Sequence, residues 1–398
     1  MEPAPSASPV SGPRTRRPSR RTVIGAAVAA AALSALPHPA QAAPGTRSRV
    51  VPPLDPKALR AAIDDLRHPR VTAAQLRIGG PAGSWYGASG AADIQRERSP
   101  RSDDRVRIGS VSKAFVATVL LQLAAERRVS LDATVQRCLP GLLPDRFAPI
   151  TPAQLLDHTS GLPDSAEPEP VTPEEIVAYR HNHRTPGQIV AAVSGQRAMK
   201  FRPGTKQEYR GINYVLAALV IERVTGRPYG REIGSRIVRP LGLHGTSVPG
   251  DDPLVHGPRV HGYVEMSDGT LRDITRYNQG FSWGEGEMIS TAHDLDRFVT
   301  ALYSGALLPP DMLDRMFTLP AGVKMLDGSP ARYGQGLQTG EMNGVTLWGK
   351  SGWQYGYNSG MLATRDLQRR LVFSFSPTRQ TGDEEQMTQR IVKAATAP

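Results

Sequence analysis

Apolar positions along the chain alternate between the spacing of helices and the spacing of strands. Residues 54–66 have apolar side chains at helical intervals, which predicts a helix. Strand-like segments follow at 71–78 and 85–92, on either side of a glycine-rich turn. The pattern becomes strongly helical over 110–127. We therefore expect a helix and two strands before one long helix.

The middle of the chain is helical, and its last part returns to strands. The expected middle helices cover 152–158, 173–179, 186–194, 213–225 and 229–237. A further helix is expected at 294–303, strands at 346–350, 359–364 and 371–376, and a last helix at 384–395. This order predicts an α/β sheet domain built from both ends of the chain, 43–110 and 290–398, with an inserted helical domain at 111–289.

The first 42 residues have the pattern of an export signal. Five arginines lie between positions 14 and 21, an apolar stretch covers 23–36, and Ala40-Gln41-Ala42 provides a cleavage site. Ser19-Arg20-Arg21 and the residues after it also resemble the twin-arginine signal. We expect a secreted or cell-wall-associated protein. No other segment reaches the roughly 18 apolar residues that a membrane span requires.

Composition places the chain among ordinary globular proteins. Its 398 residues are 39% apolar and 21% charged, which suits about two domains. The net charge of +11 suggests a nucleic-acid binder, but the arginines are scattered and no nucleic-acid-binding motif is present. Attraction to an anionic cell envelope and an arginine-rich proteome remain alternative explanations of the charge.

Cysteine and histidine usage argues against disulfides and metals. Cys138 is the only cysteine, so an intramolecular disulfide or a thiolate cluster is excluded, and a small packing role is expected. His181 and His183 could form a metal pair, but no flanking carboxylate has ligand spacing. No metal or cofactor is expected.

Ser110 and Lys113 are the main candidates for chemistry. They are three residues apart at the start of the long apolar helix, so they share one helical face. A serine hydroxyl is a weak nucleophile, and a lysine that burial holds neutral can accept its proton. Backbone N–H groups at the start of the helix favour developing negative charge. Ser-x-x-Lys alone is a common pattern, so the interpretation depends on its surroundings.

Four segments, in order, resemble the serine β-lactamase and penicillin-binding-protein superfamily. They are 107–131, 155–162, 209–226 and 348–353, and the likeness is closest to secreted actinobacterial D-alanyl-D-alanine carboxypeptidases and class C β-lactamases. The resemblance covers essentially the whole chain after the export signal. It implies a β-lactamase-like fold, with an antiparallel sheet flanked by helices, an inserted all-α domain and the nucleophile between them.

The resemblance implies a role for each matched residue. Ser110 corresponds to the acylated nucleophile, Lys113 to its partner, and Tyr209 to the tyrosine that relays a proton to or from the leaving group. The expected substrate-binding residues are Lys350, Ser351, Gly352 and Trp353 on the strand that lines the cleft, and Trp283 above it. The backbone N–H groups of Ser110 and Trp353 would form the oxyanion hole.

The sequence departs from the family pattern at two positions. Gly211 stands where relatives usually have an asparagine that orients the lysine and binds the acylamide side chain of a substrate, and Asn213 matches a different position. Carboxypeptidases of this type can have a basic residue near Gln338. We therefore expect slow acylation by β-lactams with amide side chains. His158 corresponds to a structural turn residue rather than a catalytic one.

The expected function is covalent catalysis on a small peptide, ester or β-lactam. D-Ala-D-Ala-type peptides are the first expectation, with ester or β-lactam hydrolysis second. Gly211 leaves open a non-catalytic, envelope-binding relative of the same fold. A nucleic-acid or polyanion binder is disfavoured by the export signal and the motifs.

Overall fold

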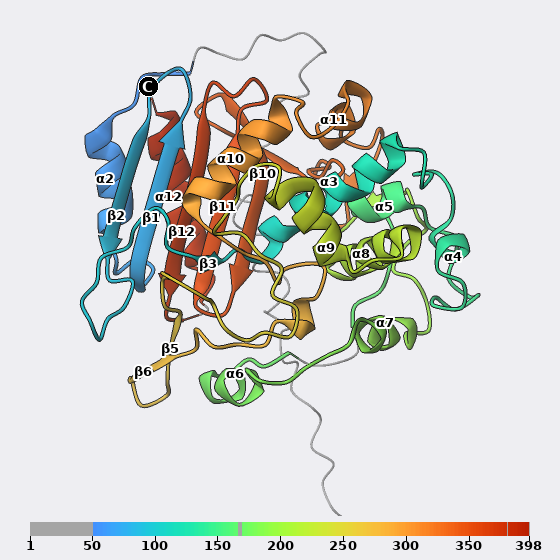
Figure 1. The fold of residues 1–398 in the computed structure, drawn as a ribbon, viewed down its shortest axis with the longest axis horizontal. Coiled ribbons are helices and arrows are strands. Elements are labelled where there is room, and N and C mark those ends of the chain that lie inside the picture. Colours follow the sequence, from blue (N-terminus) through green and yellow to red (C-terminus); the bar gives the residue numbers. More distant parts are fainter. Residues whose placement is uncertain (1–50, 166–168, 380, 398) are drawn as a thin grey trace, which may run out of the picture.

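The computed structural model describes residues 51–165, 169–379 and 381–397 (Figure 1). The predicted export signal at 1–42 lies outside these residues. No helix of the described chain is long and apolar enough to cross a membrane.

A six-stranded antiparallel sheet forms one side of the molecule (Figure 1). Its order is β2-β1-β12-β11-β10-β9, so strands from the two ends of the sequence pair in its middle. The strands are β1 (Val71–Gly79), β2 (Trp85–Gly90), β9 (Gln338–Met342), β10 (Val345–Gln354), β11 (Tyr357–Ala363) and β12 (Arg370–Pro377).

Two terminal helices cover one face of this sheet. They are α2 (Pro56–Asp64) and α12 (Glu384–Thr396), whose apolar side chains pack with those of β1, β10, β11 and β12 in one buried cluster. Alternate residues of a strand face opposite sides, so each strand also contributes to the second face. There α10 (Ala292–Tyr303) packs against β1, β11 and β12.

Most of the helices of the described chain lie between β2 and β9 in the sequence. They are α3 (Ser112–Ala125), α4 (Val135–Cys138), α5 (Pro152–Leu156), α6 (Pro173–Tyr179), α7 (Pro186–Ser194), α8 (Ile212–Thr225), α9 (Tyr229–Ile233), α10 and α11 (Pro310–Met316). α3 is buried along nearly its whole length and packs against α8, α9 and β10. The Phe115 ring stacks on Phe298 of α10 with ring centroids 3.7 Å apart. α3 therefore connects the helical part of the core to the sheet.

The predicted elements agree with the structure in type, with differences at their ends. The strand expected at 346–350 continues as β10 to Gln354, because Ser351 to Gln354 pair with the start of β11. The helix expected at 229–237 ends as α9 at Ile233 and continues as one π-helical turn, Gly234–Val238.

The sequence did not predict three short strand pairs. They are β3 (Val106–Arg107) with β7 (Ile289–Ser290), β4 (Lys206–Gln207) with β8 (Lys324–Met325), and β5 (Tyr263–Glu265) with β6 (Leu271–Asp273). The antiparallel sheet flanked by helices, with most helices between its strands, agrees with the predicted fold class.

Candidate active site

Ser110 lies in a 3₁₀ turn, Gly109–Val111, that leads directly into α3. Gly109 has φ +50°, and a Cβ at this position would lie 2.5 Å from the backbone nitrogen of Trp353. Glycine is therefore required both by the backbone conformation and by the close approach of β10. The Ser112 hydroxyl donates to Gly109 O at 2.7 Å and accepts the Met288 N–H at 3.1 Å, which fixes the turn.

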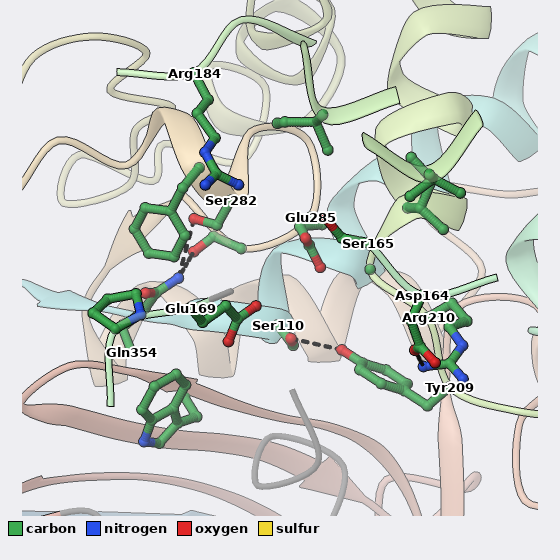
Figure 2. Close-up of a pocket in the computed structure, with 18 of the residues that line it drawn as sticks. Ser110, Asp164, Ser165, Glu169, Arg184, Tyr209, Arg210, Ser282, Glu285 and Gln354 are labelled. Carbon is green, nitrogen blue, oxygen red and sulfur yellow. Dashed lines mark hydrogen bonds and ion pairs between the residues drawn. The ribbon is translucent and has the colours of Figure 1, made fainter. Parts of the chain in front are cut away.

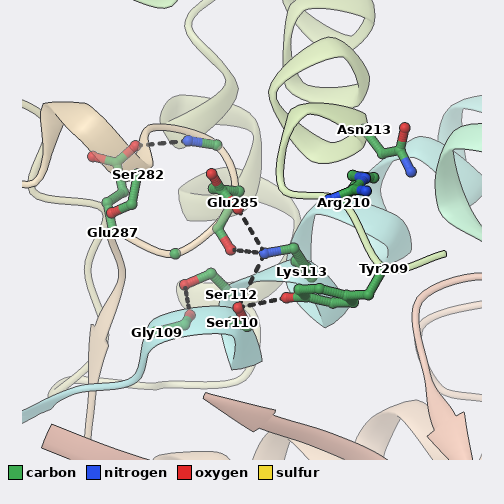
Figure 3. A network of polar contacts seen from close by, with 12 residues as sticks. Gly109, Ser110, Ser112, Lys113, Tyr209, Arg210, Asn213, Ser282, Glu285 and Glu287 are labelled. Carbon is green, nitrogen blue, oxygen red and sulfur yellow. Dashed lines mark hydrogen bonds and ion pairs between the residues drawn. The ribbon is translucent and has the colours of Figure 1, made fainter. Parts of the chain in front are cut away.

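The Ser110 hydroxyl lies between an amine and a phenol (Figure 3). Lys113 Nζ is 3.0 Å from Ser110 Oγ, one helical turn away, as their spacing predicts. Tyr209 Oη, from the segment before α8, donates to Ser110 Oγ at 2.6 Å. These distances allow direct proton transfer between the serine and either neighbour.

Burial and charge set the protonation of this group. Burial alone would lower the pKa of Lys113, but the charges and hydrogen bonds of Tyr209 and Glu285 raise it above its usual range. Burial raises the pKa of the Tyr209 phenol, and the Lys113 ammonium opposes that shift. Burial and the nearby Lys113 charge lower the pKa of Lys350 well below its usual value. Of the two lysines, Lys113 is therefore the one that holds its proton more strongly.

The four residues predicted on the late strand all lie in β10 beside the nucleophile. Lys350 Nζ lies 4.5 Å from the centroid of the Tyr209 ring and is buried without a hydrogen-bond partner among the described residues. A Cβ on Gly352 would lie 1.9 Å from Ile108 O and 2.8 Å from Ser110 N, so only glycine permits this contact. Ser351 and Trp353 are also buried. The roles of these residues in binding stay predictions.

An open pocket leads from Ser110 to the surface (Figure 2). The residues that line it are Ser110, Pro163, Asp164, Ser165, Glu169, Pro170, Tyr179, Arg184, Ile189, Val193, Tyr209, Arg210, Gly211, Ile212, Phe281, Ser282, Glu285, Gly286, Trp353, Gln354 and Tyr355. One part of the wall is aromatic and another is aliphatic. The lining also includes three carboxylate and two guanidinium side chains, those of Asp164, Glu169, Glu285, Arg184 and Arg210.

Trp283, predicted to lie above the cleft, does not line this pocket. Its ring packs edge-on against Tyr229 of α9, with centroids 4.8 Å apart, and contacts the main hydrophobic core. Phe281, two residues earlier, lines the pocket instead. The chain forms a 3₁₀ turn at Gly280–Ser282, so the two neighbouring aromatic residues face different surroundings.

Glu285 is the site residue that the sequence did not predict. Its Oε2 lies 3.0 Å from Lys113 Nζ, and its backbone carbonyl accepts from the same ammonium at 2.7 Å. Gln354 donates to the adjacent Gly286 O and to Ser282 Oγ, each at 3.1 Å, and so ties this loop to β10. The available sequence signal was a glutamate between two glycines, Gly284 and Gly286.

Glu285 occupies the space beside Gly211, where relatives usually have an asparagine side chain. A Cβ on Gly211 would lie 1.9 Å from Glu285 Oε2. The sequence predicted that Lys113 lacks the asparagine that usually orients it. Lys113 is not without a partner, because the Glu285 carboxylate contacts its ammonium instead. Asn213 does not replace it: its amide lies 3.1 Å from His158 Nδ1, and its Oδ1 accepts from Ser160 Oγ at 2.6 Å.

His158 contacts the segment that carries Tyr209 and has a structural role there. Its Nδ1 accepts the Arg210 N–H at 3.2 Å, and its ring lies 4.6 Å from the Tyr209 ring, centroid to centroid. Burial, together with the charges of Lys350, Lys113 and Arg210, lowers the pKa of His158 well below its usual value. A neutral, buried imidazole that holds backbone and ring contacts agrees with the predicted structural role.

Three other residues that the sequence singled out, His183, Cys138 and Gln338, do not line the pocket. His183 pairs with Asp251, Nδ1 to Oδ1 at 2.6 Å, and within the described chain no three His, Cys, Asp or Glu side chains are placed to hold a metal ion. Cys138 ends α4 and is half-buried, and desolvation raises the pKa of its thiol. Gln338 is fully buried in β9.

Comparison with known proteins identifies relatives over most of the chain. The family model Beta-lactamase matches residues 58–396. Penicillin-binding protein 4* of Bacillus subtilis is 26% identical over 332 residues, which cover 78% of this chain and 68% of that protein. The structure of a D-stereospecific amidohydrolase from Streptomyces sp. is 34% identical with a TM-score of 0.75, over 86% of this chain and 99% of that one. The structure of the D-amino acid amidase from Ochrobactrum anthropi SV3 is 25% identical with a TM-score of 0.71, and the match covers 85% of this chain and 97% of that one.

Proposed function

The chain belongs to the beta-lactamase family, and from this premise we propose that it is an amidohydrolase that forms an acyl-enzyme on Ser110. The observation that supports this most strongly is the Ser110 hydroxyl, placed 3.0 Å from Lys113 Nζ and 2.6 Å from Tyr209 Oη at the base of an open pocket. A nucleophile within hydrogen-bonding reach of its base is the arrangement that covalent catalysis requires.

The reaction proceeds in two halves. The Lys113 ammonium, whose pKa is raised by Tyr209 and Glu285, first loses a proton to solvent. Ser110 Oγ then attacks the substrate carbonyl carbon while its proton passes to the Lys113 amine. Tyr209 then relays a proton to the leaving nitrogen, and the carbon–nitrogen bond breaks to leave an ester on Ser110. Water hydrolyses that ester by the same route in reverse. The N–H groups of Ser110 and Trp353 stabilise the oxyanion in both halves.

The substrates are amides or short peptides whose acyl part is a D-amino acid with a free ammonium group. Two relatives that cover nearly the same length are named as a D-stereospecific amidohydrolase and a D-amino acid amidase, which supports the stereochemistry. Phe281, Tyr179 and Tyr355 offer an aromatic wall for a large side chain.

The charge of the pocket supports a cationic substrate. Glu169 points toward Ser110 (Figure 2), and although the residue as a whole is exposed, desolvation in the pocket and the charge of Glu285 raise the pKa of its carboxyl group. Two carboxylates that repel each other would be stabilised by an ammonium group between them. The Arg184 charge opposes this effect on Glu169.

A D-alanyl-D-alanine carboxypeptidase is the second candidate. Lys350 Nζ, buried beside the Tyr209 ring, and the adjacent Ser351 support it, since together they could hold a terminal carboxylate. The buried Gln338 offers no positive charge for this purpose. Esters and β-lactams are further substrates of the same acylation chemistry.

Export to the cell envelope is part of the proposal. The arginines before position 22, the apolar stretch after them and Ala40-Gln41-Ala42 support it. The enzyme would then meet small amides or peptides outside the cytoplasm, with association to the cell wall as a further possibility of the same proposal.

The test compares the release of ammonia from D- and L-phenylalaninamide with the release of D-alanine from a D-Ala-D-Ala peptide. We expect faster turnover of the D-amide than of the L-amide, and slow turnover of the peptide. Acetylation of the substrate's amino group should reduce the rate, since it removes the ammonium charge. Faster release of D-alanine than of ammonia would favour the carboxypeptidase instead, and absence of turnover with all three would favour a non-catalytic relative. Ser110→Ala is the control.

A further inference from the structure

Among the described residues, Lys113 forms an ion pair with one carboxylate, that of Glu285, from a distant part of the sequence (Figure 3). Glu285 Oε2 lies 3.0 Å from Lys113 Nζ, on the side of the ammonium away from Tyr209. The Glu285 carbonyl adds a second hydrogen bond at 2.7 Å. With Ser110 Oγ at 3.0 Å, the three hydrogens of the ammonium are matched by three acceptors.

Gly211 makes this arrangement possible. Its backbone has φ −64° and ψ −44°, which any residue adopts, so the backbone does not require glycine. A Cβ there would instead lie 1.9 Å from Glu285 Oε2 and 2.3 Å from Glu285 Cδ. Even alanine at this position would displace the carboxylate, so Gly211 and Glu285 depend on each other.

We propose that Glu285 is a positioning residue, the counter-ion that directs Lys113 toward Ser110 and sets the pH at which Lys113 can accept the serine proton. This inference rests on the proposed function, since it assumes that Ser110 is acylated. Before attack, the Lys113 ammonium loses one proton to solvent. During attack, Ser110 Oγ bonds to the carbonyl carbon and the serine proton passes to Lys113 Nζ. This restores the ammonium and its ion pair with Glu285.

Glu285 is the carboxylate among the described groups that surround Lys113. The titratable groups that face it are Glu285, Tyr209, Tyr214, Lys350 and His158. Burial raises the pKa of both tyrosines and lowers the pKa of Lys350 and of His158, so in each case it favours the neutral form. Glu285 is the carboxylate in contact with the ammonium, and with Tyr209 it raises the pKa of Lys113.

Removing that charge has two opposite consequences. Neutral Lys113 should form at lower pH, because the carboxylate no longer stabilises the ammonium. The maximum rate of acylation should fall, because the ammonium formed during attack loses its counter-ion and Nζ loses one of its anchors. A residue with only a structural role would lower the rate without moving its pH midpoint.

The test follows covalent labelling of Ser110 by a fluorophosphonate as a function of pH. This neutral probe reports the attack of Ser110 and does not depend on the identity of the natural substrate. Glu285→Gln should move the midpoint of the rate to lower pH by about 1–3 units and lower the plateau. Gly211→Ala should move it in the same direction, and the double variant should move it no further than Glu285→Gln alone.

The matched control is Gly234→Ala, where an added Cβ has no neighbour within 4 Å. It should label as the wild type does. A pH midpoint of labelling that is unchanged in both Glu285→Gln and Gly211→Ala would overturn the inference. Thermal unfolding of each variant shows whether it is folded and can be compared with the wild type. If one variant does not fold, the other decides. A folded wild type that is never labelled would instead overturn the proposed function.

Discussion

Replacing Lys113 by methionine should destabilise the protein as well as prevent acylation. The side chain of Lys113 is 0% exposed and that of Glu285 is 24% exposed. The substitution keeps an unbranched side chain that is one atom shorter, and it leaves the Glu285 carboxylate and carbonyl without the ammonium. Breaking a buried ion pair costs about 3–5 kcal/mol, and since Glu285 keeps some contact with water we expect about 2–3 kcal/mol.

Urea denaturation of the wild type, Lys113→Met and Lys113→Met/Glu285→Gln measures this effect. The double variant removes the stranded charge, so it should recover about 1–2 kcal/mol of the stability lost in the single variant. The comparison is valid if the denaturant dependence of the unfolding free energy is the same for all three proteins. Equal stability of the single and the double variant would refute the reasoning, because it would mean that Glu285 carries no unpaired charge in Lys113→Met.

Four further substitutions test the site and two other parts of the structure. Ser110→Ala and Lys113→Ala should each abolish nearly all amide turnover, and steady-state kinetics should find the double variant little worse, because the two residues act as a unit. Burial raises the pKa of Asp157 from 3.8 to about 6, so its ionisation destabilises the fold as pH rises through that range. Asp157→Asn should therefore gain about 1–3 kcal/mol at neutral pH and nothing in acid, as measured by denaturation at each pH. Phe115→Ala, which removes a buried ring stacked on Phe298, should cost about 3–5 kcal/mol in the same assay.

Local sequence signals predicted the elements whose ends are fixed locally. α6 and α7 have the predicted bounds because each begins with a threonine cap, a proline in the first turn and a returning side chain, Glu175 or Gln188. β9 was not predicted, because Gln338–Met342 is polar in sequence and becomes a strand only through pairing with β10. Its structure depends on a tertiary contact that no local pattern contains.

The same distinction applies to the site. Ser110 and Lys113 were predictable because their contact depends on helical spacing alone. Glu285 reaches Lys113 only because the loop before β7 folds over the start of α3, and sequence spacing cannot express this. Gly211 indicated a departure from the family's usual asparagine, but the sequence did not show that Glu285 fills the space. Trp283 was placed in the cleft by resemblance, whereas its packing on Tyr229 turns it toward the core.

The measurement that tests the central claim most directly is the intact mass of the protein after incubation with a fluorophosphonate, followed by peptide mapping. The claim that Ser110 is the acylated nucleophile predicts one adduct per chain, located on the peptide that contains Ser110, and no adduct in Ser110→Ala. An unlabelled wild type, or an adduct that persists in folded Ser110→Ala, would contradict it.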